Sequence, residues 1–217
     1  MKLFISADIE GCVGTTLASE THKETPEYRQ FAKRMTEEVR IVCQAALEAG
    51  ADEIVVKDGH GDATNIDFTA MPEGVTLIRG KSGHPYNMMF GLDETFDGVL
   101  YVGYHAPAGN GGNPISHTST GNSNQILLNG KVMSEFMLNT YTAAMMGVPA
   151  VFISGDEGIC GLAREMVPGI TTAAVKKGVG ACTINMSVAA ADRLLKEKVK
   201  EALSGDLKAC RIAMPEQ

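Results

Sequence analysis

The sequence predicts an α/β protein in which a mostly parallel sheet is flanked by helices and carries a β-hairpin insertion. Short apolar runs alternate with longer amphipathic stretches along the chain, which is the pattern of βα units around a parallel sheet. The 217 residues are enough for one well-buried core, and no repeat, low-complexity tract or linker divides them. We therefore expect a single α/β domain over residues 1–217.

The first half of the chain is expected to begin with a strand and a long helix. The apolar segment Lys2–Ala7 is the first strand, and a polar loop follows it. Pro26 then opens a stretch whose apolar residues recur at helical spacing, and Gly50 suits the position just after the helix. A short helix is expected near Met88. Further strands are expected at residues 54–57, 75–78 and 99–104.

The second half begins with an irregular loop and a hairpin. Residues 106–113 are rich in Gly, Asn and Pro, which favours a surface loop. Asn129-Gly130 lies between two apolar segments and is the strongest two-residue hairpin signal. Ser134 is a suitable N-cap for a helix that runs to Met146. Strands are then expected at residues 150–154 and 171–175, and helices at 157–166 and 187–203.

Composition excludes several classes of function. A net charge of −7 without a Lys/Arg run argues against nucleic-acid binding, which needs a clustered positive surface. No apolar run has the length of a membrane span, and the N-terminal residues lack the pattern of an export signal. Five scattered cysteines without C-x-x-C spacing predict reduced thiols, no disulfide and a cytoplasmic location.

Candidate metal ligands stand where three predicted strands end. Asp8 and Glu10 follow the first strand, Asp58 and His60 the second, and His105 the strand at 99–104. Parallel sheets place their chemistry at the carboxyl ends of the strands. Carboxylates mixed with imidazoles suit zinc, and more than four ligands would allow two ions. The sequence therefore predicts a metal site at this edge of the sheet.

Asp8 and Glu10 support two different interpretations. Residues at i and i+2 of a strand point the same way, so both carboxylates can face one ion, with Asp8 nearer the sheet as a candidate bridging ligand. An Asp at this place also commonly caps the following turn. The pair further fits a Mg²⁺-dependent phosphatase of the haloacid-dehalogenase type, with Asp8 as nucleophile. That family normally has Asp where Glu10 stands, and the three histidines His60, His105 and His117 would have no role.

Three further residues are candidates without a fixed role. His117 lies twelve positions beyond His105, across the glycine-rich loop, and can fold back over the same site. A neutral imidazole there can be a fifth ligand, a general acid or base, a nucleophile, or simply a solvated loop residue. Glu135 in the first turn of a helix gains from the helix dipole without any function. Asn139 is on the same helix face as Glu135 and can bind a ligand or the substrate.

A longer set of segments resembles the D-aminopeptidase family of dinuclear zinc peptidases. The order and spacing of these segments extend through almost the whole chain, which makes the resemblance more specific than any single motif. The segments are residues 1–11, Asp58-Gly-His60, 91–96, 103–106, Ser116-His117, Leu138-Asn139, Ser154-Gly-Asp156 and 171–176.

The resemblance implies a site, a reaction and an assembly. It implies that Asp8 (bridging), Glu10, His60, His105 and Glu135 bind two zinc ions, and that His117 is the catalytic residue. It gives the second strand's ligand as His60 rather than Asp58. It implies release of N-terminal D-amino acids such as D-Ala from short peptides, in a ring-based homodecamer. Family members usually continue into further C-terminal structure, so the resemblance also implies a catalytic domain that lacks this extension.

Three functions follow from these observations. The first is a zinc-dependent aminopeptidase that acts on short D-amino-acid peptides, with Asn139 as a substrate-binding residue. The second is the Mg²⁺-dependent phosphatase. The third is a metal-binding scaffold without turnover. The identity of the bound metal distinguishes the first two, because a phosphatase of that type requires Mg²⁺.

Overall fold

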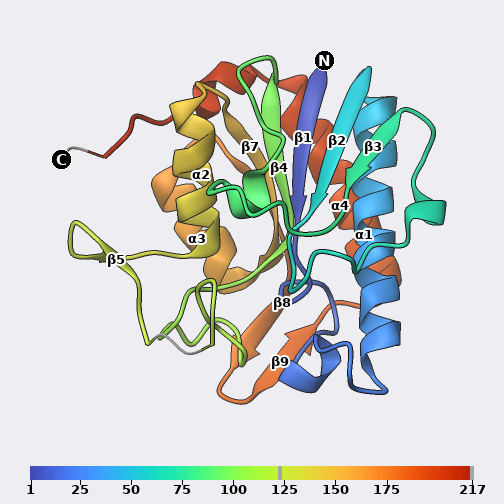
Figure 1. Cartoon of the computed structure of the whole chain (residues 1–217), viewed down its shortest axis with the longest axis vertical. Helices are drawn as coiled ribbons and strands as arrows, with labels where there is room; N and C mark the ends of the chain where they lie inside the picture. The colour runs from blue at the N-terminus through green and yellow to red at the C-terminus, as the bar shows by residue number, and fades with distance from the viewer. Residues whose placement is uncertain (122–123, 216–217) are drawn as a thin grey trace.

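The computed structural model describes residues 1–121 and 124–215 and has a seven-stranded sheet at its centre (Figure 1). The strand order is β3-β2-β1-β4-β7-β8-β9, and all neighbours are parallel except β8 and β9. The strands of this sheet are β1 (Lys2–Ala7), β2 (Glu53–Asp58), β3 (Val75–Ile78), β4 (Gly98–Tyr104), β7 (Ala150–Asp156), β8 (Thr171–Val179) and β9 (Cys182–Asn185). A separate hairpin pairs β5 (Leu127–Leu128) with β6 (Lys131–Val132).

The helices form two pairs with the sheet between them. Helix α1 packs against α4, and α2 packs against α3 (Figure 1). The α-helices are α1 (Tyr28–Glu48), α2 (Glu135–Met145), α3 (Glu157–Met166) and α4 (Val188–Ser204), and the 3₁₀ turns are η1 (Ala18–Glu20), η2 (Phe68–Ala70), η3 (Asn87–Met89) and η4 (Leu207–Cys210). In the part of the chain that the structure describes, no helix is both long and apolar enough to cross a bilayer.

The strand order reverses between β1 and β4, and this reversal determines where a ligand can bind. The chain leaves β1 towards β2 on one side, whereas β4 lies on the other side of β1 and leads on to β7. Loops at the carboxyl ends of two such strands diverge and leave a crevice between them. Both strands are central and almost entirely buried, as expected for strands covered by helices on both faces. The crevice therefore opens above the core of the molecule.

Local sequence signals explain most of the element boundaries. Gly50 has φ +94° directly after the last turn of α1, and the Ser134 side chain accepts a hydrogen bond from Met137 N at the start of α2. Asn129 and Gly130 both have positive φ, as a two-residue hairpin turn requires. The predicted fold class, the hairpin and the positions of the main helices and strands are confirmed.

One strand was not predicted. β8 runs on to Val179, and β9 pairs with it in an antiparallel hairpin that ends the sheet. The residues of β9 are mostly exposed, so no apolar alternation marks them. The turn between the two strands uses Gly180 at φ +58°. The sequence pattern fails here because an exposed edge strand lacks the buried face that makes strands recognisable.

Glycines let the loop after β1 lie directly against the end of β4. Gly11 N donates a hydrogen bond to Gly103 O at 2.7 Å. A Cβ atom on Gly11 would lie 1.8 Å from Tyr104 O, a backbone atom that cannot rotate away. Gly155 at the end of β7 makes a similar approach, since its Cβ would lie 1.9 Å from the same oxygen. These contacts hold the carboxyl ends of three strands together.

We expect Gly11→Ala to lower the free energy of unfolding by about 2 kcal/mol or more, because the added methyl overpacks a rigid backbone contact. Gly161→Ala in α3 is the matched control. A Cβ there meets nothing within 4 Å, and the change should stabilise the helix by about 0.5–1 kcal/mol. Urea unfolding of both variants measures the difference, and a Gly11→Ala variant as stable as the wild type would contradict the close contact.

Candidate metal centre

The ends of β1, β2 and β4 bring their polar residues together. Asp8 N donates to Val102 O at 2.8 Å, so the pairing of β1 with β4 continues as far as Asp8. Gly59 N donates to Ala7 O at 2.9 Å and carries the pairing of β2 up to the residue before His60. His105 follows β4 directly. The sheet therefore fixes the backbone on which three of the predicted site residues stand.

Asp8 lies at the centre of the cluster, and its two oxygens face different histidines. His60 Nδ1 lies 3.3 Å from Asp8 Oδ1 and 3.0 Å from Glu10 Oε1. His105 Nε2 lies 3.6 Å from Asp8 Oδ2 and 3.7 Å from Glu135 Oε1. The five residues form two groups that share Asp8. This is the arrangement that a carboxylate between two cations would require.

The loop that carries His117 folds back onto the cluster. The His117 ring stacks on that of His105, with centroids 4.4 Å apart and an interplanar angle of 23°. Its Nε2 atom lies 3.5 Å from Glu135 Oε1, which also accepts a hydrogen bond from Ser119 N at 2.7 Å. The His117 side chain is 25% exposed, whereas that of His105 is 1% exposed. His117 therefore lies on the open side of the cluster.

Each of the three histidines has one ring nitrogen held by a backbone carbonyl. A carbonyl oxygen only accepts hydrogen bonds, so the nitrogen that contacts it carries the proton. In the neutral ring the other nitrogen then has a free lone pair, and in all three residues that nitrogen faces a carboxylate. Backbone groups commonly fix metal-binding histidines in this way. The contacts are His60 Nε2 to Thr21 O (2.8 Å), His105 Nδ1 to Ala106 O (2.9 Å) and His117 Nδ1 to Ile115 O (3.0 Å).

The mutual electrostatics of the cluster show how strongly it attracts positive charge. Burial alone favours the neutral form of His60, yet the charge of Glu10 and hydrogen bonds to Asp8 and Glu10 raise the pKa of His60 to about 11. Burial likewise opposes ionisation of His105, but Glu135, Glu10 and Asp8 raise its pKa to about 9. In Glu10, the effect of His60 outweighs burial and lowers the pKa. Burial and the charge of Asp8 raise the pKa of Glu135.

The donor atoms fit a metal. Glu10 Oε2 and His105 Nε2 are buried and have no hydrogen-bond partner among the described residues. Ligand atoms of Asp8, Glu10 and His105 lie within 4.8 Å of one another, and so do those of His105, His117 and Glu135. Carboxylate oxygens and imidazole nitrogens are the ligands that zinc takes in open catalytic sites. The second group includes His117, so the geometry alone allows that residue to be a ligand.

Asp58 lies near the cluster but its carboxylate has another role. Its oxygens accept hydrogen bonds from Asn65 N at 2.6 Å, Asn65 Nδ2 at 2.8 Å and Ile66 N at 2.8 Å. It is fully buried and holds the loop after His60 in place. The first interpretation of the strand ends included Asp58 among the candidate ligands, and these contacts account for its carboxylate without a metal.

Asn139 lies beneath the cluster in a buried hydrogen-bond chain. Its Nδ2 atom donates to Tyr104 Oη at 2.9 Å, and that hydroxyl lies 2.6 Å from Ser6 Oγ. The side chain thus links α2 to the two central strands. Contact between Asn139 and a substrate stays a prediction.

Two residues that were not predicted from the sequence bind the backbone carbonyl of Glu10. Asn113 Nδ2 donates to Glu10 O at 3.0 Å, and the buried Lys176 ammonium donates to Glu10 O and to Thr15 O. Burial lowers the pKa of Lys176. A lysine after an apolar run of β8 is the one sequence signal that could have marked this contact, whereas Asn113 lies in an irregular loop without any signal.

The cluster is accessible from two cavities. One, of about 90 Å³, is lined by Asp8, His60, His117 and Glu135 among others. The other, of about 360 Å³, is lined by Glu10, and it shares His60 and His117 with the first. A small molecule can therefore reach the carboxylates and the exposed edge of His117 together.

Comparisons with known proteins identify the family of this chain. The chain is 33% identical over 218 residues to the D-aminopeptidase of Bacillus subtilis (strain 168), covering 100% of this chain and 79% of that protein. The structure matches that of the Zn-dependent D-aminopeptidase DppA from Bacillus subtilis, described as a self-compartmentalizing protease, with a TM-score of 0.94 and 32% identity over 99% of this chain and 78% of that one. The family model described as D-aminopeptidase matches residues 1–217. The resemblance seen in the sequence is thus confirmed, and the chain belongs to the D-aminopeptidase family.

Proposed function

We propose that this protein is a zinc-dependent aminopeptidase that releases N-terminal D-amino acids, such as D-Ala, from short peptides. The observation that carries the proposal is the buried cluster in which three histidines direct a free ring nitrogen at three carboxylates. Membership of the D-aminopeptidase family and the similarity to a Zn-dependent member support both the metal and the reaction.

The proposal includes two zinc ions per chain. Asp8, Glu10, His60, His105 and Glu135 would hold them, with Glu10 and His60 on one side of Asp8 and His105 and Glu135 on the other. Support comes from the two oxygens of Asp8, which face different histidines, and from the unpartnered ligand atoms of Glu10 and His105. Zinc and protons compete for the same nitrogens. The imidazole protons that the carboxylates attract would therefore leave when the metal binds.

We assign His117 the catalytic role. Bound zinc supplies Lewis-acid polarisation of the scissile carbonyl and lowers the pKa of water. The backbone carbonyl of Ile115 fixes the His117 ring, so that Nε2 faces Glu135 and the cluster. From there it can accept a proton from the attacking water and give it to the leaving amine. Alternatively, it can attack the carbonyl itself, expel the amine and then lose the acyl group to water. Glu135 and the stacked His105 ring keep the imidazole in this orientation.

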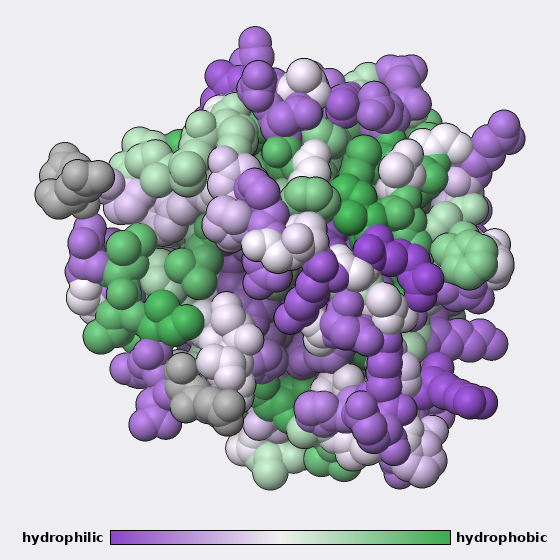
Figure 2. Space-filling model, viewed as in Figure 1, coloured by the Kyte–Doolittle hydropathy of each residue, from purple (hydrophilic) through white to green (hydrophobic). Residues whose placement is uncertain are grey.

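Assembly and location complete the proposal. We propose a homo-oligomer, a ring-based decamer by family resemblance, in the cytoplasm. The solved relative is described as self-compartmentalizing. Figure 2 shows an apolar patch at the left of this face, over the β5–β6 hairpin, where Leu127 is 58% exposed. Exposed apolar patches of this kind are typical of interfaces between subunits. The five cysteines are all unpaired, which suits a reducing compartment.

The proposed reaction is tested with D-Ala-D-Ala, L-Ala-L-Ala and an aryl phosphate, each with and without added zinc. We expect zinc-dependent release of D-Ala and little hydrolysis of the L-dipeptide. Equal rates on the two dipeptides would contradict the stereochemical assignment. Cleavage of the phosphate ester alone, with Mg²⁺, would indicate the phosphatase that the family match disfavours. Bound zinc without turnover of any substrate would indicate a metal-binding scaffold.

His117→Ala should lower kcat by about a hundredfold or more, because a general acid–base group typically contributes 10²–10⁴-fold to the rate. Zinc content should stay near that of the wild type, since the five proposed ligands remain. His60→Ala is the comparison that should lose zinc as well as activity. Atomic absorption on the purified variants measures the metal. Loss of zinc from His117→Ala would make His117 a ligand instead.

A further inference from the structure

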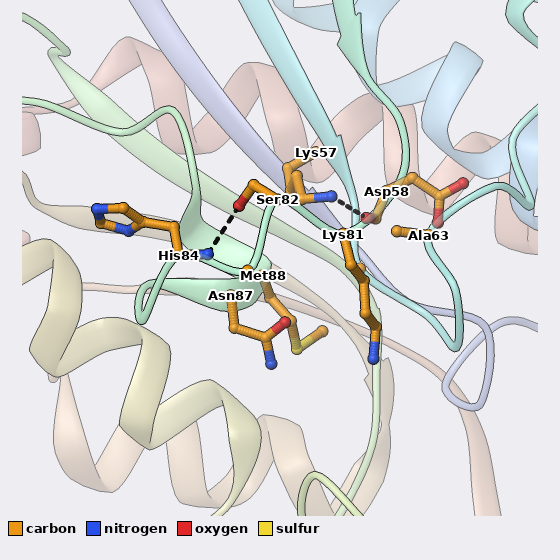
Figure 3. A pocket seen from close by; sticks show the side chains of 10 residues that line it. Lys57, Asp58, Ala63, Lys81, Ser82, His84, Asn87 and Met88 are labelled. Carbon is orange, nitrogen blue, oxygen red and sulfur yellow. Dashed lines mark hydrogen bonds between the residues drawn. The ribbon is translucent and has the colours of Figure 1, made fainter.

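A third cavity adjoins the metal centre, beside the end of β2 (Figure 3). Its volume is about 130 Å³, and its lining includes the segment 81–84 that follows β3. It shares Gly59, Lys81, Asn87 and Met88 with the cavity that contains Asp8, His60, His117 and Glu135. The shared residues form the boundary between the two spaces. A molecule bound at the metal centre can therefore extend past them.

Lys81 is the cation at this boundary with a free charge. Its side chain is exposed and makes no hydrogen bond or ion pair within residues 1–121 and 124–215. Lys57 lines the third cavity too, but it is buried, and its ammonium donates to Asp58 O at 2.9 Å and Gly80 O at 2.8 Å. In Figure 3, Lys57 points to Asp58, whereas Lys81 and Asn87 extend away from it in the same direction.

The backbone beneath Lys81 is fixed in place. Gly80 N donates to Ala63 O at 2.6 Å, and Gly80 O accepts from Lys57. Asn87 opens η3 with φ +44°, a conformation that Asn adopts more readily than most residues. Its side-chain amide is exposed and has no hydrogen-bond partner in the described part of the chain either. The Lys81 ammonium and the Asn87 side-chain amide therefore both lack a hydrogen-bond partner in the described residues, and both lie on ordered backbone next to the proposed metal ligands.

We propose that Lys81, assisted by Asn87, binds the free C-terminal carboxylate of the peptide substrate and so restricts the enzyme to dipeptides and tripeptides. This inference rests on the proposed aminopeptidase function. A peptide extends by about 3.3–3.6 Å per residue, so the carboxylate of a dipeptide held at the metal centre lies within one or two residues of the scissile bond. A cation at the wall of the same small cavity matches that position. Longer peptides would place their carboxylate beyond it.

The metal centre and Lys81 together match the two ends of a short zwitterionic peptide. The metal centre would bind the amino end with its scissile carbonyl, and the free ammonium of Lys81 attracts the carboxylate at the opposite end. A hydrogen bond to a charged group contributes more than one between neutral groups. An amide in place of the carboxylate would lose this interaction while leaving the scissile bond unchanged. The contrast between free acid and amide therefore reports on recognition of the carboxylate.

The experiment uses the zinc-loaded protein, with D-Ala-D-Ala and its C-terminal amide as substrates. Lys81→Met keeps most of the side-chain volume and removes the charge. We expect wild-type kcat/KM to be about 10- to 100-fold higher for the acid than for the amide. Lys81→Met should lose this preference, mainly through KM, and should act on the amide as the wild type does. Lys33→Met, on the exposed face of α1, is the matched control and should keep the preference.

Binding provides a readout that does not depend on turnover. Calorimetry would compare the methyleneamino isostere of D-Ala-D-Ala, as free acid and as amide, on the same three proteins. Tighter binding of the acid that Lys81→Met abolishes supports the carboxylate site, even if no hydrolysis occurs and the proposed reaction fails. Equal binding of acid and amide by the wild type overturns it, even if D-Ala is released. Equal losses on both compounds in Lys81→Met would also overturn it.

Discussion

The site depends on neutralising three carboxylates that the fold buries within a few ångströms of one another. Asp8, Glu10 and Glu135 are 2%, 3% and 6% exposed. Buried like charges repel and lose their hydration, so such a group is stable only with compensating positive charge. The histidines supply it as protons, which is why the pKa of His60 rises to about 11. A zinc ion bound there would supply more charge at the same place. In this account the attraction for protons and the attraction for metal have one cause.

The sheet brings these charged residues together on ordered backbone rather than on flexible loops. Asp8 and His105 follow two adjacent central strands at the reversal of strand order, and backbone hydrogen bonds continue the sheet as far as Asp8 and Gly59. Gly11 permits the close approach of the loop that carries Glu10, and Lys176 fixes the backbone of Glu10 from the opposite side. Preorganised ligands lose little entropy when they bind a metal or a substrate. The rigid sheet edge is therefore part of the chemistry.

The sequence predicted the elements and residues that have a local pattern. Periodicity predicted the strands that carry Asp8, His60 and His105, because buried parallel strands are continuous apolar runs. Glu135 and a catalytic His117 came only from the family resemblance, since the path of the loop after β4 decides which side chains return to the site. The sequence did not predict strand β9 or the roles of Asn113 and Lys81. Their roles depend on exposed edges, backbone contacts and cavity walls, which leave no periodic signal.

The most direct test of the account is X-ray diffraction from zinc-loaded crystals at the zinc absorption edge. Two anomalous peaks, about 3.5–4 Å apart as in other two-metal sites, should lie on either side of Asp8. Glu10 and His60 should contact one, and His105 and Glu135 the other, with His117 Nε2 outside both coordination shells. A single peak, or a peak without Asp8 as ligand, would contradict the claim that this carboxylate cluster is a dinuclear zinc centre.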